Sequence, residues 1–188
     1  MANGHRCPVQ LAGSLDTKIR RWFQNPQKIL SPYIKEGMTV LDIGCGPGFF
    51  TLDMAQMVGE KGRVIAADLQ VGMLQKLEKK ISGTALEERI KLHQSNEDRI
   101  GLTEEVDFIL AFYMVHEAPY QDKFFNDIKS ILKTSGQMLI VEPPLHVSWK
   151  SFSQSITNAK KAGLLTKEGP KIPFNKTAIV RSTLKSGW

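Results

Sequence analysis

The sequence predicts a doubly wound α/β fold with a mostly parallel seven-stranded sheet that ends in a C-terminal antiparallel hairpin. First, short apolar segments alternate along the chain with segments whose large apolar residues recur at helical spacing. Second, the apolar segments contain few polar residues, which is typical of parallel strands covered by helices on both faces. Third, glycines follow the first such segment at residues 44–48, where this fold places its first strand-to-helix turn.

The chain up to residue 93 supplies the first strands and helices. Strands are expected where β-branched and aliphatic runs are bounded by glycine or polar residues, at 39–43, 63–68 and 90–93. Helices are expected from the spacing of large apolar residues, at 17–23, from Pro26 onward, at 49–58 and at 71–81. Gly59 and Gly62 end the helix at 49–58, so the first strand, this helix and the second strand form a βαβ unit.

The rest of the chain continues the alternation and then changes to a hairpin. Strands are expected at 106–112 and 137–141, and helices at 120–132 and 148–163. After the last helix, two strands at 170–174 and 177–182, joined by Asn175 and Lys176, are expected to form the closing β-hairpin.

The length of 188 residues fits a single domain. Residues 1–36 are expected to form an N-terminal helical segment that acts as a lid, and residues 37–188 the core. The longest apolar run, 108–115, is well short of the roughly 20 residues that a transmembrane helix needs. The N-terminus lacks the apolar stretch of a secretory signal. We therefore expect a cytoplasmic protein without a membrane span, and no oligomeric state is predicted.

The net charge of +6 is spread unevenly along the chain. The charged residues of segments 1–35 and 146–188 are mostly Lys and Arg, whereas residues 36–145 contain more acids than bases. This asymmetry has two interpretations. The one we favour is that the lysines lie on solvated surface helices, and the alternative is contact with an anionic partner such as RNA.

The cysteines and histidines do not follow a metal-binding pattern. Cys7 and Cys45 lack a CxxC partner, and His5, His93 and His146 are scattered along the chain. Both cysteines are expected to be free thiols, since a reducing cytoplasm disfavours a disulfide. No metal site is predicted.

Residues 42–48, Asp-Ile-Gly-Cys-Gly-Pro-Gly, form the most informative segment. Glycines at a first strand-to-helix turn permit positive φ and let a ligand approach the backbone without a Cβ in the way. A dinucleotide fingerprint reads G-x-G-x-x-G, but Phe49 or Thr51 occupies the last position in the two frames. A Walker loop is also excluded, because no Gly-Lys-Ser/Thr follows.

Residues 40–48 resemble the first motif of class I S-adenosylmethionine (SAM)-dependent methyltransferases, an acid followed by G-x-G-x-G. Over residues 38–141 the chain is most similar to the small stand-alone enzymes of the ubiquinone/menaquinone-biosynthesis-like group. The resemblance implies SAM as the cofactor and S-adenosylhomocysteine as the product. It implies cofactor contacts from five residues of the motif, which are Asp42, Gly44, Cys45, Gly46 and Gly48.

The same resemblance assigns cofactor contacts to residues at the ends of later strands. Asp68 would accept hydrogen bonds from both ribose hydroxyls, although it could instead cap the helix that follows. Leu69 would lie against the adenine, and Ser95 and Asn96 would bond the polar edge of the base. Family members often have Asp-Ala at these two positions, so this chain departs from the pattern there. Ala111 and Phe112 would border the methionine part of the cofactor or, in the alternative, belong to the core of a buried strand.

Methyl transfer from a sulfonium is an in-line displacement, so the protein mainly has to align the acceptor and exclude water. An acceptor hydroxyl or amine that must lose a proton also needs a base. His116 is the first candidate and Tyr113 the second, because both follow the fourth strand, where this family places acceptor-side groups. His116 could instead pack against the next helix. Glu142 could face the same rim, but we favour a surface turn residue.

The first functional hypothesis is a SAM-dependent methyltransferase with a small-molecule acceptor. It rests on residues 111–114, Ala-Phe-Tyr-Met, which stand where methyltransferases of amino groups in adenine or glutamine have D/N-P-P-Y. One alternative is an RNA or protein methyltransferase, suggested by the two basic ends. Another is a SAM-binding protein without catalytic activity. A nucleic-acid partner is therefore considered but not favoured.

Overall fold

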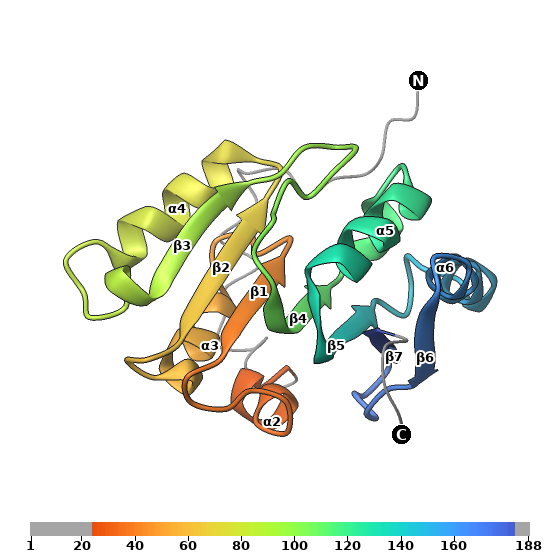
Figure 1. Cartoon of the computed structure of the whole chain (residues 1–188), viewed down its shortest axis with the longest axis horizontal. Helices are drawn as coiled ribbons and strands as arrows, with labels where there is room; N and C mark the ends of the chain where they lie inside the picture. The colour runs from red at the N-terminus through yellow and green to blue at the C-terminus, as the bar shows by residue number, and fades with distance from the viewer. Residues whose placement is uncertain (1–23, 183–188) are drawn as a thin grey trace.

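A computed structural model describes residues 24–182, and its strands form one sheet in the order β3-β2-β1-β4-β5-β7-β6 (Figure 1). The strands are β1 (Thr39–Ile43), β2 (Arg63–Asp68), β3 (Ile90–Gln94), β4 (Val106–Phe112), β5 (Leu132–Glu142), β6 (Leu164–Glu168) and β7 (Lys176–Ser182). The first five strands pair in parallel, and β7 runs antiparallel to both β5 and β6. This arrangement confirms the predicted doubly wound fold and its antiparallel end.

Helices cover both faces of the sheet because successive strand residues point to opposite sides. Val40 of β1 packs in the cluster that includes α2 (Pro26–Leu30), α3 (Thr51–Val58) and α4 (Val71–Ile81). Leu41 packs in the cluster that includes α5 (Gln121–Ile131) and α6 (Trp149–Lys161). Two short 3-10 helices, η2 (Glu87–Arg89) and η3 (Val115–Glu117), lie in the connections. The central strands β1, β2 and β4 are therefore buried on both sides, as their apolar character predicted, whereas the edge strands β3 and β6 are partly exposed.

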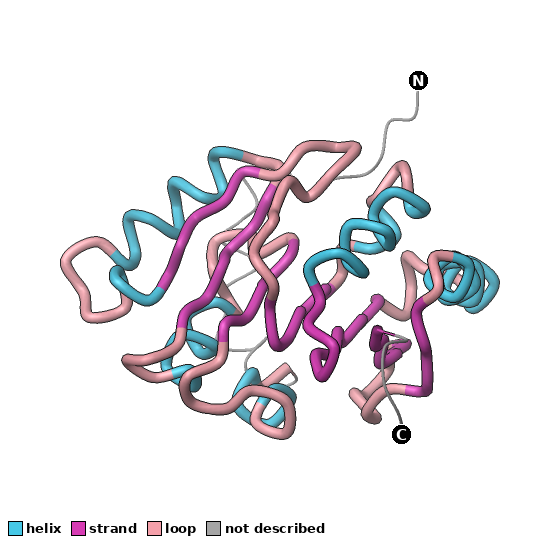
Figure 2. The backbone as a smooth tube through the Cα atoms, in the orientation of Figure 1, coloured by secondary structure: helices cyan, strands magenta, loops and turns pink. Residues whose placement is uncertain are grey.

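The connection from β3 to β4 departs from the βαβ pattern. Between these two strands the structure describes every residue and shows no helix, so the crossover is made by the loop 95–105 (Figure 2). Ile100, 4% exposed, anchors this loop in the core on the α5 side of the sheet. The loop therefore covers part of this face of the sheet in place of a helix. Its first half lies at the carboxyl end of the sheet.

The closing hairpin differs from the prediction in its first strand. The prediction of a strand at 170–174 is wrong: β6 is Leu164–Glu168, and 169–175 is the loop that joins it to β7. The physical reason is that Pro170 and Pro173 have no N–H to donate to a strand ladder. The second strand agrees with the prediction, since β7 begins at Lys176.

β5 also begins earlier than predicted, at Leu132 instead of residue 137. Its register with β4 shifts between Val106 and Phe108, so the polar residues 133–135 belong to an irregular start of the strand that the apolar pattern did not indicate. The helix predicted from Pro26 is confirmed as α2, with the Asn25 side chain accepting a hydrogen bond from Lys28 N at 3.2 Å.

Part of the predicted lid lies within the described chain. Leu30 and Ile34 are buried in the core, and the ring of Tyr33 stacks on Phe108 at 5.5 Å. The helix predicted at 17–23 and Cys7 lie outside the described residues, so the lid remains a prediction. No helix between residues 24 and 182 is long and apolar enough to cross a membrane.

Candidate functional site

The glycine loop lies where the order of the sheet reverses, between the carboxyl ends of β1 and β4. Gly44 N and Cys45 N both donate to Ala67 O at the end of β2, at 2.8 and 3.1 Å. Gly44 has φ +71, and a Cβ added there would lie 2.9 Å from Cβ of Met114, just after β4. Glycine is therefore required at this point by both conformation and close approach.

Asp42 lies beneath this loop with 2% of its surface exposed. Its carboxylate accepts a 2.6 Å hydrogen bond from the Thr51 hydroxyl at the start of α3. The contact joins the end of β1 to the helix that follows the glycines, so Asp42 fixes the loop as well as lining the cavity described below.

Asp68 is buried at the end of β2, with 8% of its surface exposed. Its two carboxylate oxygens accept hydrogen bonds from Gln70 N at 2.8 Å and Gly46 N at 2.9 Å. Burial raises the pKa of this carboxyl above its usual value, and the backbone donors partly offset that effect. The carboxylate therefore holds the glycine loop and the turn before α4 in place.

A cavity of about 840 Å³ opens along this edge of the sheet. Its volume lies within the roughly 300–1,000 Å³ that is usual for small-molecule sites. Its wall includes eleven of the thirteen predicted site residues: Asp42, Gly44, Cys45, Gly46, Asp68, Leu69, Ser95, Asn96, Phe112, Tyr113 and His116. The fold thus brings the glycine loop and the candidate base into one enclosure.

Two predicted cofactor residues lie away from the cavity wall. Ala111 is buried in the core on the α5 side of the sheet. Gly48 faces α4, and with φ +90 a Cβ there would lie 2.5 Å from Cδ1 of Leu77. The third glycine of the motif is therefore explained by the packing of the loop on α4.

Cys45 lines the cavity but is itself 6% exposed. Burial, followed by the charges of Asp42 and Asp68, raises the pKa of its thiol well above 9.0. The thiolate, which is the reactive form, is therefore disfavoured at this position.

His116 and Glu142 form a close pair across the rim of the cavity. His116 Nδ1 lies 2.5 Å from Glu142 Oε2, and His116 N donates to Glu142 Oε1 at 3.1 Å. Burial lowers the pKa of His116, but the hydrogen bond and charge of Glu142, with the charge of Glu117, raise it more. The net pKa lies above the usual 6.5. Glu142 is 1% exposed, so our preferred interpretation of it as a surface turn residue is wrong.

Tyr113 has an unusual backbone for a large side chain, with φ +64. Its hydroxyl donates to Asn175 Oδ1 at 2.5 Å and accepts from Gln24 Nε2 at 2.6 Å. Sequence reasoning did not identify Gln24 or Asn175 as site residues, because nothing in their local sequence marks them. Only the fold brings them to Tyr113.

The charge of the cavity wall is mostly negative. Five acids line it against one arginine, Arg99, and two histidines, and these acids are Asp42, Asp68, Glu97, Asp98 and Glu117. Among residues 24–182, no three His, Cys, Asp or Glu side chains are grouped so that they could hold a metal ion.

Residues 34–175 match the model of a family described as a methyltransferase domain. Among curated proteins, the chain is 30% identical over 135 residues to demethylmenaquinone methyltransferase of Lactobacillus johnsonii. The matched segment covers 68% of this chain and 55% of that protein. The chain is 26% identical over 153 residues to the ubiquinone/menaquinone biosynthesis C-methyltransferase of Klebsiella pneumoniae, covering 78% and 61%. The chain therefore spans little more than half the length of these relatives.

Among solved structures, a SAM-dependent methyltransferase from Aquifex aeolicus superposes with a TM-score of 0.82 at 27% identity, covering 93% of this chain and 98% of that one. Aeropyrum pernix fibrillarin, solved with natively bound SAM, has a TM-score of 0.62 at 18% identity, covering 79% and 62%, and shares the fold. The matches to the family and to these structures agree with the glycine motif and the strand order. The chain belongs to the class I SAM-dependent methyltransferases, whose cofactor is S-adenosyl-L-methionine.

Proposed function

We propose that this protein transfers a methyl group from SAM to a small-molecule acceptor in the cavity that joins the glycine loop to His116. The observation that carries the proposal is the continuity of this one cavity. Its wall includes the motif residues that follow β1 and also His116, which follows β4 and whose partner Glu142 is buried. A ligand-binding site and a candidate proton acceptor therefore share one enclosure.

The residues present fit the cofactor. A Cβ at Gly46 would meet no atom within 4 Å, so the glycine leaves open space on the cavity side. The Asp68 carboxylate has capacity beyond its backbone donors, since a carboxylate can accept about four hydrogen bonds. It suits two ribose hydroxyls, and the interaction would compensate for its burial. Leu69, Ser95 and Asn96 line the same part of the wall and are proposed to hold the adenine.

An aromatic wall lies beside the glycine loop. The rings of Phe50 and Phe112 are 4.4 Å apart, those of Phe112 and Tyr113 are 4.5 Å apart, and all three residues line the cavity. SAM when bound supplies an electrophilic methyl group on a positively charged sulfonium. Aromatic faces attract cations, and the acidic side chains around the cavity act in the same direction.

His116 is proposed as the base that accepts the proton of the acceptor. The Glu142 carboxylate contacts Nδ1 and so favours the tautomer whose Nε2 is the basic nitrogen. A raised pKa makes His116 a stronger base than free imidazole. Tyr113, a second candidate, is proposed to shape the wall, because its hydroxyl is already engaged by Asn175 and Gln24.

The charge of the cavity favours a small molecule over RNA as the acceptor. The five acids around it would repel a phosphate backbone that approached the transferring methyl. The two curated relatives reported above are named for methylation in quinone biosynthesis, and this supports a small organic acceptor.

The proposal is tested by supplying methyl-labelled SAM and a cell extract to the wild-type protein and to His116→Gln. We expect label in the small-molecule fraction with wild type and at least about tenfold less with His116→Gln, since general bases contribute about 10²–10⁴-fold. Label in RNA or protein would contradict the small-molecule acceptor. Cofactor binding without labelled product in any fraction would point to a non-catalytic SAM-binding protein.

A further inference from the structure

Three large apolar side chains project into solvent from neighbouring parts of the C-terminal half. Leu145 is 91% exposed, Trp149 68% and Phe174 83%. Most apolar side chains of this size are buried in the protein, so a group this exposed marks a contact surface. We call these three residues the apolar rim.

Lys176 holds the members of the rim close together. Its Nζ lies 5.2 Å from the centre of the Trp149 ring and donates to Pro144 O, next to Leu145, at 3.2 Å. Phe174 precedes Lys176 by two residues. Although it is a lysine, Lys176 is 4% exposed, so it joins the loop 143–148, the start of α6 and the loop 169–175.

The backbone of Phe174 is strained without a packing benefit. Its φ is +65, a left-handed conformation that is unfavourable for a bulky side chain. Glycine or asparagine would adopt this conformation at lower cost. A strained residue is usually maintained where it serves binding or catalysis, and Phe174, 83% exposed, gains little burial against the part of the chain that the structure describes.

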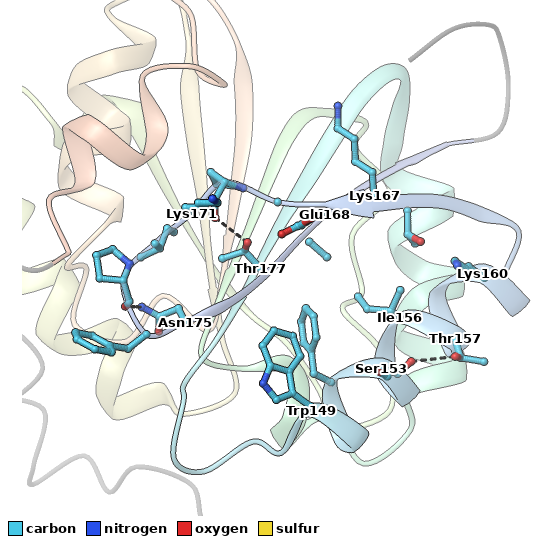
Figure 3. Close-up of a pocket in the computed structure, with 18 residues that line it drawn as sticks. Trp149, Ser153, Ile156, Thr157, Lys160, Lys167, Glu168, Lys171, Asn175 and Thr177 are labelled. Atoms are coloured by element: carbon cyan, nitrogen blue, oxygen red, sulfur yellow. Dashed lines mark hydrogen bonds between the residues drawn. The ribbon is translucent and has the colours of Figure 1, made fainter.

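The surroundings of the rim are basic. Residues 143–182 contain seven Lys and Arg and one acid, Glu168. Trp149 and Phe174 line a groove of about 770 Å³ between α6 and the β6–β7 hairpin, together with Lys160, Lys167 and Lys171. Figure 3 shows Asn175 on one side of this groove and Lys160 on the other, with Trp149 between them. The basic groove contrasts with the acidic cavity of the methyltransferase site.

We propose that the apolar rim and the lysines around it bind the surface of an anionic lipid bilayer. Leucine, tryptophan and phenylalanine insert into the boundary between headgroups and acyl chains, while nearby lysines attract anionic headgroups. A nucleic acid fits less well, because Leu145, the most exposed of the three, has no ring on which a base can stack. Bilayer binding needs neither SAM nor an acceptor, so it stands apart from the proposed function.

The rim is tested with unilamellar vesicles that contain phosphatidylserine. The double variant Leu145→Ser/Phe174→Gly should partition into these vesicles about tenfold or more weakly than wild type, because both side chains lose apolar burial in the interface. Leu165→Thr is the matched control: Leu165 is 43% exposed on β6 but does not line the groove. The control should partition like wild type.

A stability measurement separates binding from folding. Phe174→Gly should leave the melting temperature unchanged or raise it, since glycine accepts φ +65, while it weakens vesicle binding. A loss of stability in this variant would indicate a structural role and overturn the proposal. Equal partitioning of wild type and the double variant would overturn it too.

A second set of variants tests the contribution of the lysines to vesicle binding. Lys150 follows Trp149 on α6 and is exposed, as is Lys171. Lys150→Glu/Lys171→Glu should weaken binding to phosphatidylserine vesicles more than about tenfold at low salt, because each lysine near the surface contributes appreciably. Binding to phosphatidylcholine vesicles should be weak for both proteins. Tight binding of single-stranded RNA through the rim, with no binding to anionic vesicles, would replace the bilayer with a nucleic acid.

Discussion

The two sides of the cavity differ in how far along the chain their longest contacts reach. On the glycine-loop side, Asp42 bonds Thr51 nine residues away and Gly46 bonds Asp68 22 residues away. On the His116 side, the contact with Glu142 spans 26 residues and that between Tyr113 and Asn175 spans 62. The first side is therefore encoded within the β1–α3–β2 unit, whereas the second combines the β4–α5–β5 unit with the loop before β7.

This difference shows which side of the cavity can be predicted from the local sequence. The glycine loop is built by backbone geometry that few residues other than glycine can adopt, so its motif is visible in the sequence. The His116 side is built from common residues, and their partners come from the end of the next strand, β5, and from the loop before β7. Mutations on the two sides should accordingly fail in different ways.

The largest effect is expected at Gly48. Gly48→Ala combines a left-handed backbone, at about 1–2 kcal/mol, with a clash against the fully buried Leu77, at about 1–3 kcal/mol. Denaturant unfolding should show a loss of about 2–4 kcal/mol.

Gly46→Ala is the matched control, because it meets no atom within 4 Å and has φ +54. Its loss should stay at about 1–2 kcal/mol, while S-adenosylhomocysteine binding falls because the added methyl fills the cavity side. Equal losses of stability in the two variants would show that packing on α4 does not distinguish these glycines.

The next effect is expected at Asp68. Asp68→Asn keeps one oxygen to accept from Gly46 N or Gln70 N but removes the charge. Calorimetry should show S-adenosylhomocysteine binding about 10- to 100-fold more weakly, since hydrogen bonds to a charged group contribute about 1.5–3 kcal/mol. The control is Asp98→Asn, which removes an exposed acid from the same cavity wall and should change affinity little. Equal losses would mean that the total charge matters, and not a contact with the ribose.

The sequence predicted the order and type of most elements because apolar spacing reflects burial on one or both faces. It failed at the hairpin, where 170–174 is apolar enough for a strand but Pro170 and Pro173 remove the N–H groups that a ladder needs. The sequence also identified Asp42, Asp68 and most of the loop as site residues, and these line the cavity. They could be identified because the glycine motif and the strand ends are visible in the local sequence.

The His116 side was predictable only in part. His116 follows the fourth strand, and parallel strands end at one edge, so its position could be inferred. The pairing with Glu142 could not, because it depends on the register of β4 and β5, where Phe112 lies opposite Val141. Ala111 shows the converse: it ends a strand that borders the cavity, yet strand alternation turns it to the other face.

The smallest effect in free energy, and the most specific, concerns Glu142→Gln. Removing the carboxylate takes away the charge and charge-assisted hydrogen bond that raise the pKa of His116, so this pKa should fall below its wild-type value. An NMR titration of the imidazole measures the change. If His116 is the base, the rising limb of the plot of activity against pH should move to lower pH by as much as the pKa of His116 falls.

The pH dependence of stability gives an independent reading of the same pair. A histidine whose folded pKa is raised stabilises the fold fully below its unfolded value of about 6.5, and this stabilisation is lost as pH rises through the folded pKa. Wild type should therefore lose stability as the pH rises from about 6.5 to the folded pKa of His116, and Glu142→Gln should lose less over the same range. Glu117→Gln, which removes a charge but not the hydrogen bond, should lower the pKa of His116 by a smaller amount. A pKa that is unchanged or higher in Glu142→Gln would show that the carboxylate does not control His116, and would remove the main reason to treat this side of the cavity as a proton-accepting site.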